Sequence, residues 1–132
     1  MVRPIPVRSI LGLAVGLLAA ALAALLLTQG PDAGAATKAR TLRLTADKSG
    51  NLKFNTTRLT VRHGKVTILM KNPSALPHGI AVEGHGVDKD GRTVQTGGTS
   101  RVTVTLKKGT YEFYCPVDGH KAAGMKGKIT VK

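Results

Sequence analysis

Short segments in which polar and apolar residues alternate recur along the chain, separated by residues typical of turns. The clearest segment is residues 100–106, in which Val102, Val104 and Leu106 alternate with polar residues. A period of two is typical of strands with one buried face, because successive side chains point to opposite faces of a sheet. By the same criteria we expect strands at residues 41–45, 52–54, 59–61, 66–70, 79–82, 111–114 and 127–131.

Turn residues indicate how these strands connect. His63-Gly64 predicts the tip of a hairpin between residues 59–61 and 66–70, and residues 88–98 predict an exposed connection. Seven or eight short strands in one small domain predict an all-β fold, a Greek-key antiparallel β-sandwich of two sheets. The chain has no tryptophan, two phenylalanines and two tyrosines, so the core must be mainly aliphatic.

The first 36 residues have the pattern of an export signal. Arg3 and Arg8 precede an uncharged apolar run at residues 10–27, and Ala33-Gly34-Ala35 offers the small residues of a cleavage site. We therefore expect residues 1–36 to be a signal peptide and residues 37–132 to be one domain. The run is nearly long enough to span a membrane, so the alternative is an N-terminal membrane tether through residues 10–27. Either way, the positive-inside tendency places the domain outside the cytoplasm, secreted, periplasmic or at the cell surface.

The expected domain is strongly basic. Without Arg3, Arg8 and Asp32, it has 18 lysines and arginines against 6 aspartates and glutamates, a formal charge of +12. The basic residues are scattered, which fits a solvated surface and equally fits docking to an acidic partner protein or an anionic membrane surface. The export pattern and the absence of a recognised nucleic-acid motif argue against binding to nucleic acid.

The only cysteine lies in a stretch with three potential metal ligands, Cys115, His120 and Met125. A thiolate, an imidazole and a thioether together suit copper better than most other ions. Pro116 and the turn pair Asp118-Gly119 favour the chain reversal that must bring these groups together. We therefore interpret the three residues as ligands of one metal ion.

Other roles for Cys115 are an intermolecular bridge, an inert buried thiol or a nucleophile. A single cysteine cannot form an internal disulfide in an exported protein. A nucleophile would need His120 as its base, which leaves Met125 without a role, and no acyl-enzyme signature surrounds the pair. We expect no enzymatic activity.

A fourth ligand must come from another segment, and three histidines are candidates. His63 occupies the expected hairpin tip, and His85 lies between two glycines in a flexible stretch. His78 follows Pro77 at the expected start of a strand, where sheet hydrogen bonds would hold it in place. We therefore expect His78 to be the fourth ligand.

A histidine after an Asn-Pro-containing loop, followed by Tyr-Cys-x4-His-x4-Met, resembles the cupredoxins, the plastocyanin- and azurin-like blue copper proteins. The resemblance extends over residues 41–132. It implies a β-sandwich with one copper ion near one end, His78, Cys115 and His120 as equatorial ligands, and Met125 as a weak axial ligand. Such a type 1 site carries single electrons between protein partners by cycling between Cu(I) and Cu(II). We expect a monomer that exchanges electrons through His120, with Ala122, Ala123 and Pro77 as a docking patch.

One position departs from the family pattern. Gly79 replaces the asparagine that follows the first histidine in azurin and plastocyanin, so the surroundings of the site are expected to differ. Pro116 has no N–H to offer the cysteine sulfur, and fewer hydrogen bonds to a thiolate are expected to shift the redox potential.

Three alternative functions compete with electron transfer. An extracytoplasmic copper carrier or storage protein would use the same four ligands, whereas a structural zinc module would leave Met125 idle. In a plain interaction domain the cysteine, histidines and methionine would be incidental. A binuclear copper centre is excluded because it needs two cysteines, and a multicopper oxidase is excluded because one domain with four histidines cannot build the additional sites.

Overall fold

The computed structural model describes residues 39–132, so the expected export segment at residues 1–36 and the tether at residues 10–27 lie outside the described part. No helix in the described part is long and apolar enough to cross a membrane. Its regular structure consists of eight strands: β1 (Arg40–Thr45), β2 (Arg58–Val61), β3 (Gly64–Lys71), β4 (Ala81–Gly84), β5 (Val87–Asp90), β6 (Thr99–Leu106), β7 (Gly109–Tyr114) and β8 (Lys126–Val131).

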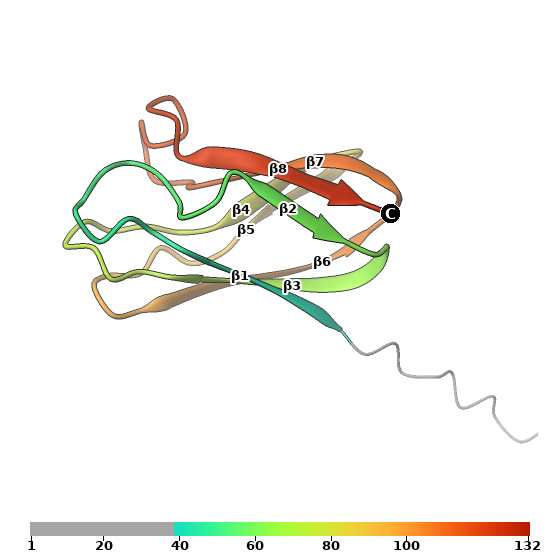
Figure 1. The fold of residues 1–132 in the computed structure, drawn as a ribbon, viewed down its shortest axis with the longest axis horizontal. Helices are drawn as coiled ribbons and strands as arrows, with labels where there is room; N and C mark the ends of the chain where they lie inside the picture. Colours follow the sequence, from blue (N-terminus) through green and yellow to red (C-terminus); the bar gives the residue numbers. More distant parts are fainter. Residues whose placement is uncertain (1–38) are drawn as a thin grey trace, which may run out of the picture. The chain divides into compact units, whose positions relative to one another are not determined.

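The strands form two sheets that lie face to face (Figure 1). Their orders are β1-β3-β6 and β2-β8-β7-β4-β5, which confirms the expected all-β sandwich. Pairing is antiparallel except for two edge strands, since β1 runs parallel to β3 and β2 runs parallel to β8. A parallel pair needs a long connection, and the chain supplies one by passing through the second sheet at β2 before it returns to β3.

Side chains from both sheets meet in one core. Inward residues of β3 and β6 alternate with exposed or half-buried residues, as expected for strands with one buried face. The rings of Phe54 and Phe113 lie 5.6 Å apart within this core. The remaining large core side chains are mainly aliphatic, as the composition predicts: Leu44, Val66, Ile68, Met70, Ile80, Val82, Val102, Val104, Leu106, Ile129 and Val131.

Three local expectations were wrong. Residues 52–54 form no strand, and only an isolated bridge links Phe54 to Ala46. The turn at His63-Gly64 is not a hairpin tip, because β2 and β3 belong to different sheets. The expected connection at residues 88–98 begins within β5, which pairs with β4 across a turn in which His85 has a φ of 48°.

The crossing from β6 to β7 passes from one sheet to the other and is held by Tyr111. Its hydroxyl accepts a hydrogen bond from the Lys107 N–H and donates one to the Lys107 carbonyl, both at 3.1 Å. The ring itself is buried in the core, so this side chain fixes the crossing to both sheets.

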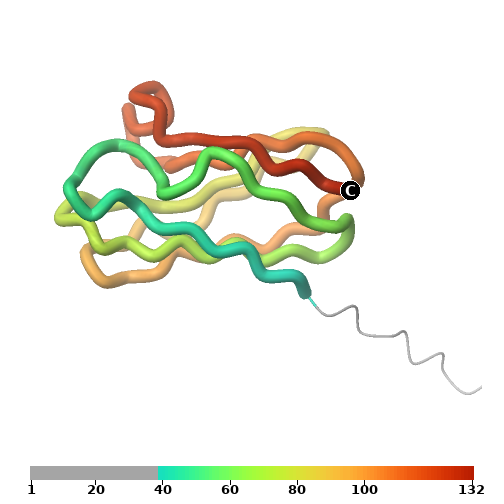
Figure 2. The backbone as a smooth tube through the Cα atoms, in the orientation of Figure 1, coloured from blue at the N-terminus to red at the C-terminus, as the bar shows by residue number. Residues whose placement is uncertain are grey.

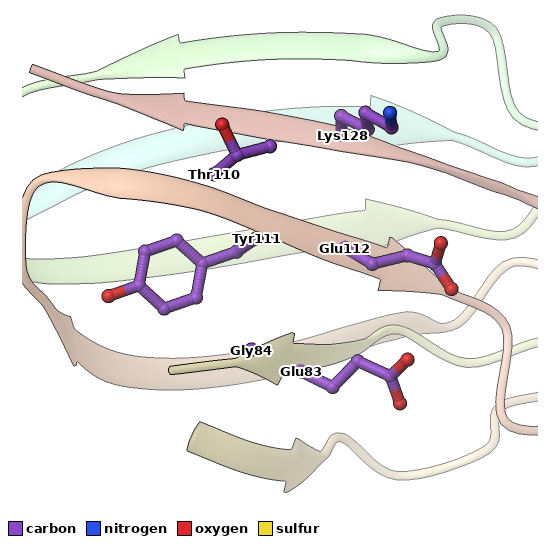
Figure 3. A pocket seen from close by; sticks show the side chains of 6 residues that line it. All are labelled: Glu83, Gly84, Thr110, Tyr111, Glu112 and Lys128. Carbon is purple, nitrogen blue, oxygen red and sulfur yellow. The ribbon is translucent and has the colours of Figure 1, made fainter. Parts of the chain in front are cut away.

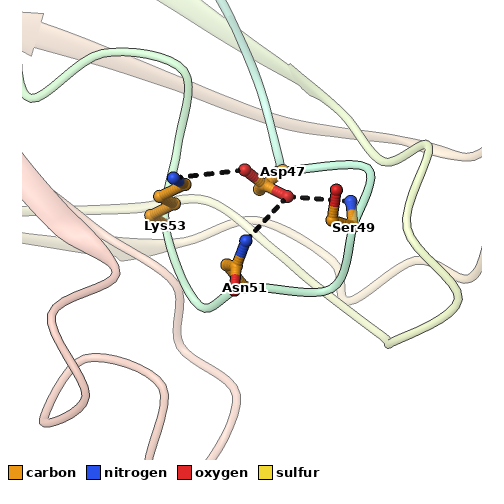
Figure 4. A network of polar contacts seen from close by, with 4 residues as sticks. All are labelled: Asp47, Ser49, Asn51 and Lys53. Carbon is orange, nitrogen blue, oxygen red and sulfur yellow. Dashed lines mark hydrogen bonds and ion pairs between the residues drawn. The ribbon is translucent and has the colours of Figure 1, made fainter.

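Several loops gather at the other end of the sandwich, away from the C-terminus. Figures 1 and 2 show residues 46–57, 72–79 and 115–125 there, although they are far apart in the sequence. The first loop is held by Asp47, whose carboxylate accepts a hydrogen bond from the Ser49 N–H at 2.8 Å and lies 3.5 Å from the Lys53 Nζ (Figure 4). The Ser49 N–H is the main reason why the pKa of Asp47 is lowered.

Candidate metal centre

The loop at residues 115–125 closes on itself where β7 and β8 meet. The Cys115 N–H donates to the Met125 carbonyl, and the Met125 N–H donates to the His120 carbonyl, both at 3.0 Å. Within the loop, the Ala123 N–H donates to the Gly119 carbonyl at 3.0 Å, which forms a single helical turn. These bonds hold Cys115, His120 and Met125 in one compact segment.

His78 lies in a neighbouring segment, just before β4. Its N–H donates to the Val94 carbonyl at 3.1 Å, and the Val94 N–H donates back to the His78 carbonyl at 2.8 Å. The histidine therefore occupies an isolated bridge rather than the expected start of a strand. The side-chain amide of the buried Asn72 donates to the carbonyls of Leu76 and Val94 at 2.8 and 3.0 Å, and so joins both segments around His78.

Three of the expected ligands come together. The candidate ligand atoms of His78, Cys115 and His120 all lie within 4.8 Å of one another. The Cys115 Sγ is 3.8 Å from the His78 Nδ1 and 3.5 Å from the His120 Nδ1. His78, Cys115 and Met125 are 0% exposed, whereas His120 is partly exposed.

These separations fit a single bound metal ion. Bonds of about 2.0 Å to nitrogen and about 2.3 Å to sulfur, at a roughly tetrahedral angle, place the two donor atoms about 3.5 Å apart. The observed Sγ–Nδ1 distances are close to that value. The buried Nε2 of His78 has no hydrogen-bond partner among the described residues, so Nδ1, which faces the sulfur, makes this ring's polar contact.

Burial sets the protonation of the site. It lowers the pKa of His78, with a smaller contribution from the nearby His120, and so favours the neutral imidazole that a metal ligand requires. Burial raises the pKa of the Cys115 thiol, while the N–H groups of Gly79 and Val117 act in the opposite direction. Metal binding at Cys115 must therefore release the thiol proton.

Gly79 and Pro116 pack against each other beside the sulfur. The Gly79 N–H donates to the Cys115 Sγ at 3.4 Å, so the thiol receives a backbone hydrogen bond although Pro116 offers none. A Cβ on residue 79 would lie 3.1 Å from the Pro116 Cγ and 3.2 Å from its Cδ. Gly79 and Pro116 therefore belong together, because the absence of a side chain at Gly79 makes room for the Pro116 ring.

Lys121, next to His120, ties the ligand loop to the five-stranded sheet. Its Nζ lies 2.6 Å from Glu83, 2.9 Å from Glu112 and 4.0 Å from the centre of the Tyr114 ring. The hydrogen bond to Glu83, followed by the interactions with Glu112, raises the pKa of Lys121. The two carboxylates come from paired positions of β4 and β7, and Figure 3 shows their side chains extending in the same direction beside a shallow hollow of about 280 Å³.

The other two histidines lie outside the cluster. His63 is in the turn between β2 and β3, where its carbonyl accepts a hydrogen bond from Arg40 at 3.0 Å. The His85 ring packs edge-on against Tyr111, with 5.0 Å between the ring centres. Sequence reasoning missed two supporting residues, Asn72 and Lys121. Only Asn72 left a signal, the Asn-Pro break of the strand before His78.

Comparisons with known proteins agree with this arrangement. A family model described as copper binding proteins, plastocyanin/azurin family, matches residues 41–132. Plastocyanin A/B of Petroselinum crispum is 37% identical over 91 residues, which cover 62% of this chain and 90% of that one. The chloroplastic plastocyanin of Oryza sativa subsp. indica is 37% identical over 134 residues, with 95% of this chain and 80% of that one covered. The structure of reduced auracyanin from Roseiflexus castenholzii matches with a TM-score of 0.63 at 26% identity, covering 71% of this chain and 98% of the auracyanin.

The matched region contains both sheets and the whole ligand loop, so the comparisons and the geometry describe the same part of the molecule. They confirm the resemblance inferred from the sequence and the assignment of copper as the cofactor. The chain therefore belongs to the copper-binding plastocyanin/azurin family.

Proposed function

We propose that the protein is a blue copper electron carrier whose single ion is held by His78, Cys115, His120 and Met125. The observation that carries this proposal is the placement of two imidazole Nδ1 atoms 3.5 and 3.8 Å from one buried sulfur. Thiolate and imidazole donors, with a thioether as a weak further ligand, are the donor set of copper electron-transfer sites. The family supports this assignment, and one auracyanin that matches this fold is described as a blue copper protein.

The protein's contribution is to hold these donors still and keep water away. Bound copper would supply a redox couple of one electron, Cu(I)/Cu(II). The backbone bonds of the 115–125 loop and the His78–Val94 bridge fix the donors in the folded protein, so little rearrangement is needed between the two states. No substrate is bound or transformed, and the protein acts as a carrier rather than an enzyme.

His120 is the proposed exit for electrons, because it is the partly exposed member of the donor set. Ala122 and Ala123 are exposed beside it on the same loop. Pro77 is half-buried, and its neighbour Leu76 is 41% exposed. We propose that these apolar residues form the surface on which protein redox partners dock.

We also propose that the domain at residues 37–132 works outside the cytoplasm, as a monomer, after export directed by residues 1–36. The basic start, the apolar run at residues 10–27 and the small residues that follow it support this location.

The visible absorption spectrum after addition of Cu(II) tests the proposed site. We expect an intense thiolate-to-copper charge-transfer band near the red end of the spectrum that is absent in Cys115→Ser. A colourless protein would refute the blue site. A blue protein that gives up its copper rapidly to a chelator, and exchanges electrons slowly, would instead indicate copper delivery.

A further inference from the structure

The outer face of the three-stranded sheet is basic and free of acidic residues. Strands β1, β3 and β6 contain no aspartate or glutamate. Arg43 of β1 and Arg101 of β6 are exposed and lie in register on either side of Leu69 in β3. Lys65 and Lys71 are exposed on the same face of β3. The other outward positions are threonines: Thr41, Thr45, Thr67, Thr99, Thr103 and Thr105.

The acidic residues gather instead on the other sheet. Four of the six in residues 37–132 are in β4, β5 and β7, namely Glu83, Asp88, Asp90 and Glu112. Asp88, Glu83 and Glu112 occupy one register row across these three strands. The sandwich is therefore polarised, and the outer face of the three-stranded sheet carries a net positive charge.

The groups on this basic face suit phosphate. Guanidinium and ammonium groups bind phosphate oxygens, the guanidinium with two parallel hydrogen bonds. The hydroxyls of Thr67 and Thr103 form a hydrogen bond with each other at 3.0 Å, which leaves one hydroxyl hydrogen for a further acceptor. A shallow hollow of about 220 Å³, lined in part by Arg43, Lys71 and Thr99, opens on this face.

We propose that the outer face of β1, β3 and β6 binds the headgroup phosphates of an anionic lipid membrane. Chain connectivity favours a lipid surface, because β1 is both the first strand and an edge of this sheet, and an apolar run at residues 10–27 precedes it in the sequence. The alternative N-terminal tether through that run would hold the domain at a membrane.

Other occupants of this face are disfavoured. A second copy would bring together two domains of formal charge +12, which repel each other. A redox partner must approach the ligand loops, and these lie at the end of the sandwich rather than on the face of the sheet (Figure 1). Binding through this face therefore leaves the metal centre free for a partner.

Vesicle binding of residues 37–132 tests the proposal. These residues include both complete sheets and their core, and they contain the region whose structure matches 98% of auracyanin. The domain is titrated with vesicles of phosphatidylcholine containing phosphatidylglycerol and with pure phosphatidylcholine, at low and high salt. We expect binding to the anionic vesicles alone, weakened by salt. The double variant Arg43→Gln/Arg101→Gln is expected to lose about 30-fold in affinity, about fivefold for each cation.

The matched control is Arg58→Gln/Lys128→Gln, which removes the same charge from exposed, paired positions of the other sheet. A smaller loss in the control supports the basic face, whereas equal losses in the two variants overturn it. Absence of binding to anionic vesicles also overturns it, as does binding to poly-glutamate without binding to vesicles. Circular dichroism checks folding, and Lys65→Gln/Lys71→Gln replaces the first variant if that one is unfolded. Copper is not needed in these measurements, so the outcome is independent of the proposed electron transfer.

Discussion

Replacing Lys121 by methionine should destabilise the protein although Lys121 is not a ligand. The substitution keeps the length of the side chain and removes two ion pairs and the contact with the Tyr114 ring. The side chains of Lys121, Glu83 and Glu112 are 35%, 40% and 30% exposed, so solvent screening limits each pair to roughly 0.3–1 kcal/mol. The ring contact adds about 0.5 kcal/mol. We expect the free energy of unfolding to fall by about 1–2 kcal/mol in total. Part of this fall comes from repulsion between the carboxylates of Glu83 and Glu112, which remain without their cation.

Thermal unfolding of the copper-loaded protein measures this loss. For a domain of this size, we expect the Lys121→Met variant to melt roughly 5–10 °C lower than the wild type. Because Lys121 holds the loop that carries His120, copper should also pass to a chelator several-fold faster. High salt should reduce the difference between the two proteins, since the pairs are partly exposed.

Lys126→Met is the control, because Lys126 is exposed and makes no ion pair within residues 39–132. A double-mutant cycle with Glu112→Gln isolates the pair and should give a coupling of about 0.3–1 kcal/mol. If Lys121→Met has the same melting temperature as the control and releases copper at the wild-type rate, Lys121 does not hold the loop.

Three further predictions concern Gly79, Pro116 and Asp47. Gly79→Ala should destabilise the protein by about 1–3 kcal/mol, because the new Cβ would press on the Pro116 ring. Adding Pro116→Ala should recover part of this stability. A melting temperature of Gly79→Ala equal to that of the wild type would contradict the packing described. Pro116→Ala alone should raise the reduction potential, because a new N–H beside the sulfur stabilises the more negative reduced state; an unchanged potential in voltammetry would remove this idea. Asp47→Asn should make the free energy of unfolding less sensitive to acid. The pKa of Asp47 is lowered in the folded state, so its ionised carboxylate stabilises the fold above the ordinary pKa. This stabilisation is lost as the pH falls through the pKa of the folded state. Urea unfolding from neutral pH to pH 3 checks this, and parallel pH profiles for Asp47→Asn and wild type would refute it.

Strands with one buried face were predictable from the sequence, and their pairing was not. β6 alternates buried and exposed residues along its full length, so its pattern alone identified it. β5 has the sequence Val-Asp-Lys-Asp and buries little, and it forms because β4 offers it an edge across the turn at His85. Periodicity reports one buried face and carries no information about the partner strand, so the turn at His63-Gly64 was mistaken for a hairpin.

The proposed donor residues stand out by their chemistry, because a lone cysteine, a histidine and a methionine in one loop have few other joint uses. The residues that hold these donors in place could not be inferred from the sequence. Lys121 reaches Glu83 and Asn72 reaches Val94 across long separations in sequence, and polar residues in loops leave no periodic signal. Gly79 could be recognised as a departure from the family, but its reason became visible only with the ring of Pro116 packed against it.

The spacing of the donors along the chain has a consequence for the order of folding. Three of them lie in the loop of the β7–β8 hairpin, a local structure that can form early. His78 is 37 residues before Cys115 and reaches the sulfur only after β4 has paired with β7 and the His78–Val94 bridge has formed. With the proposed donor set, an unfinished chain presents an incomplete site, and we expect the full affinity for copper only at the last stage of assembly. Metal capture would then distinguish a completed sandwich from a partly folded one.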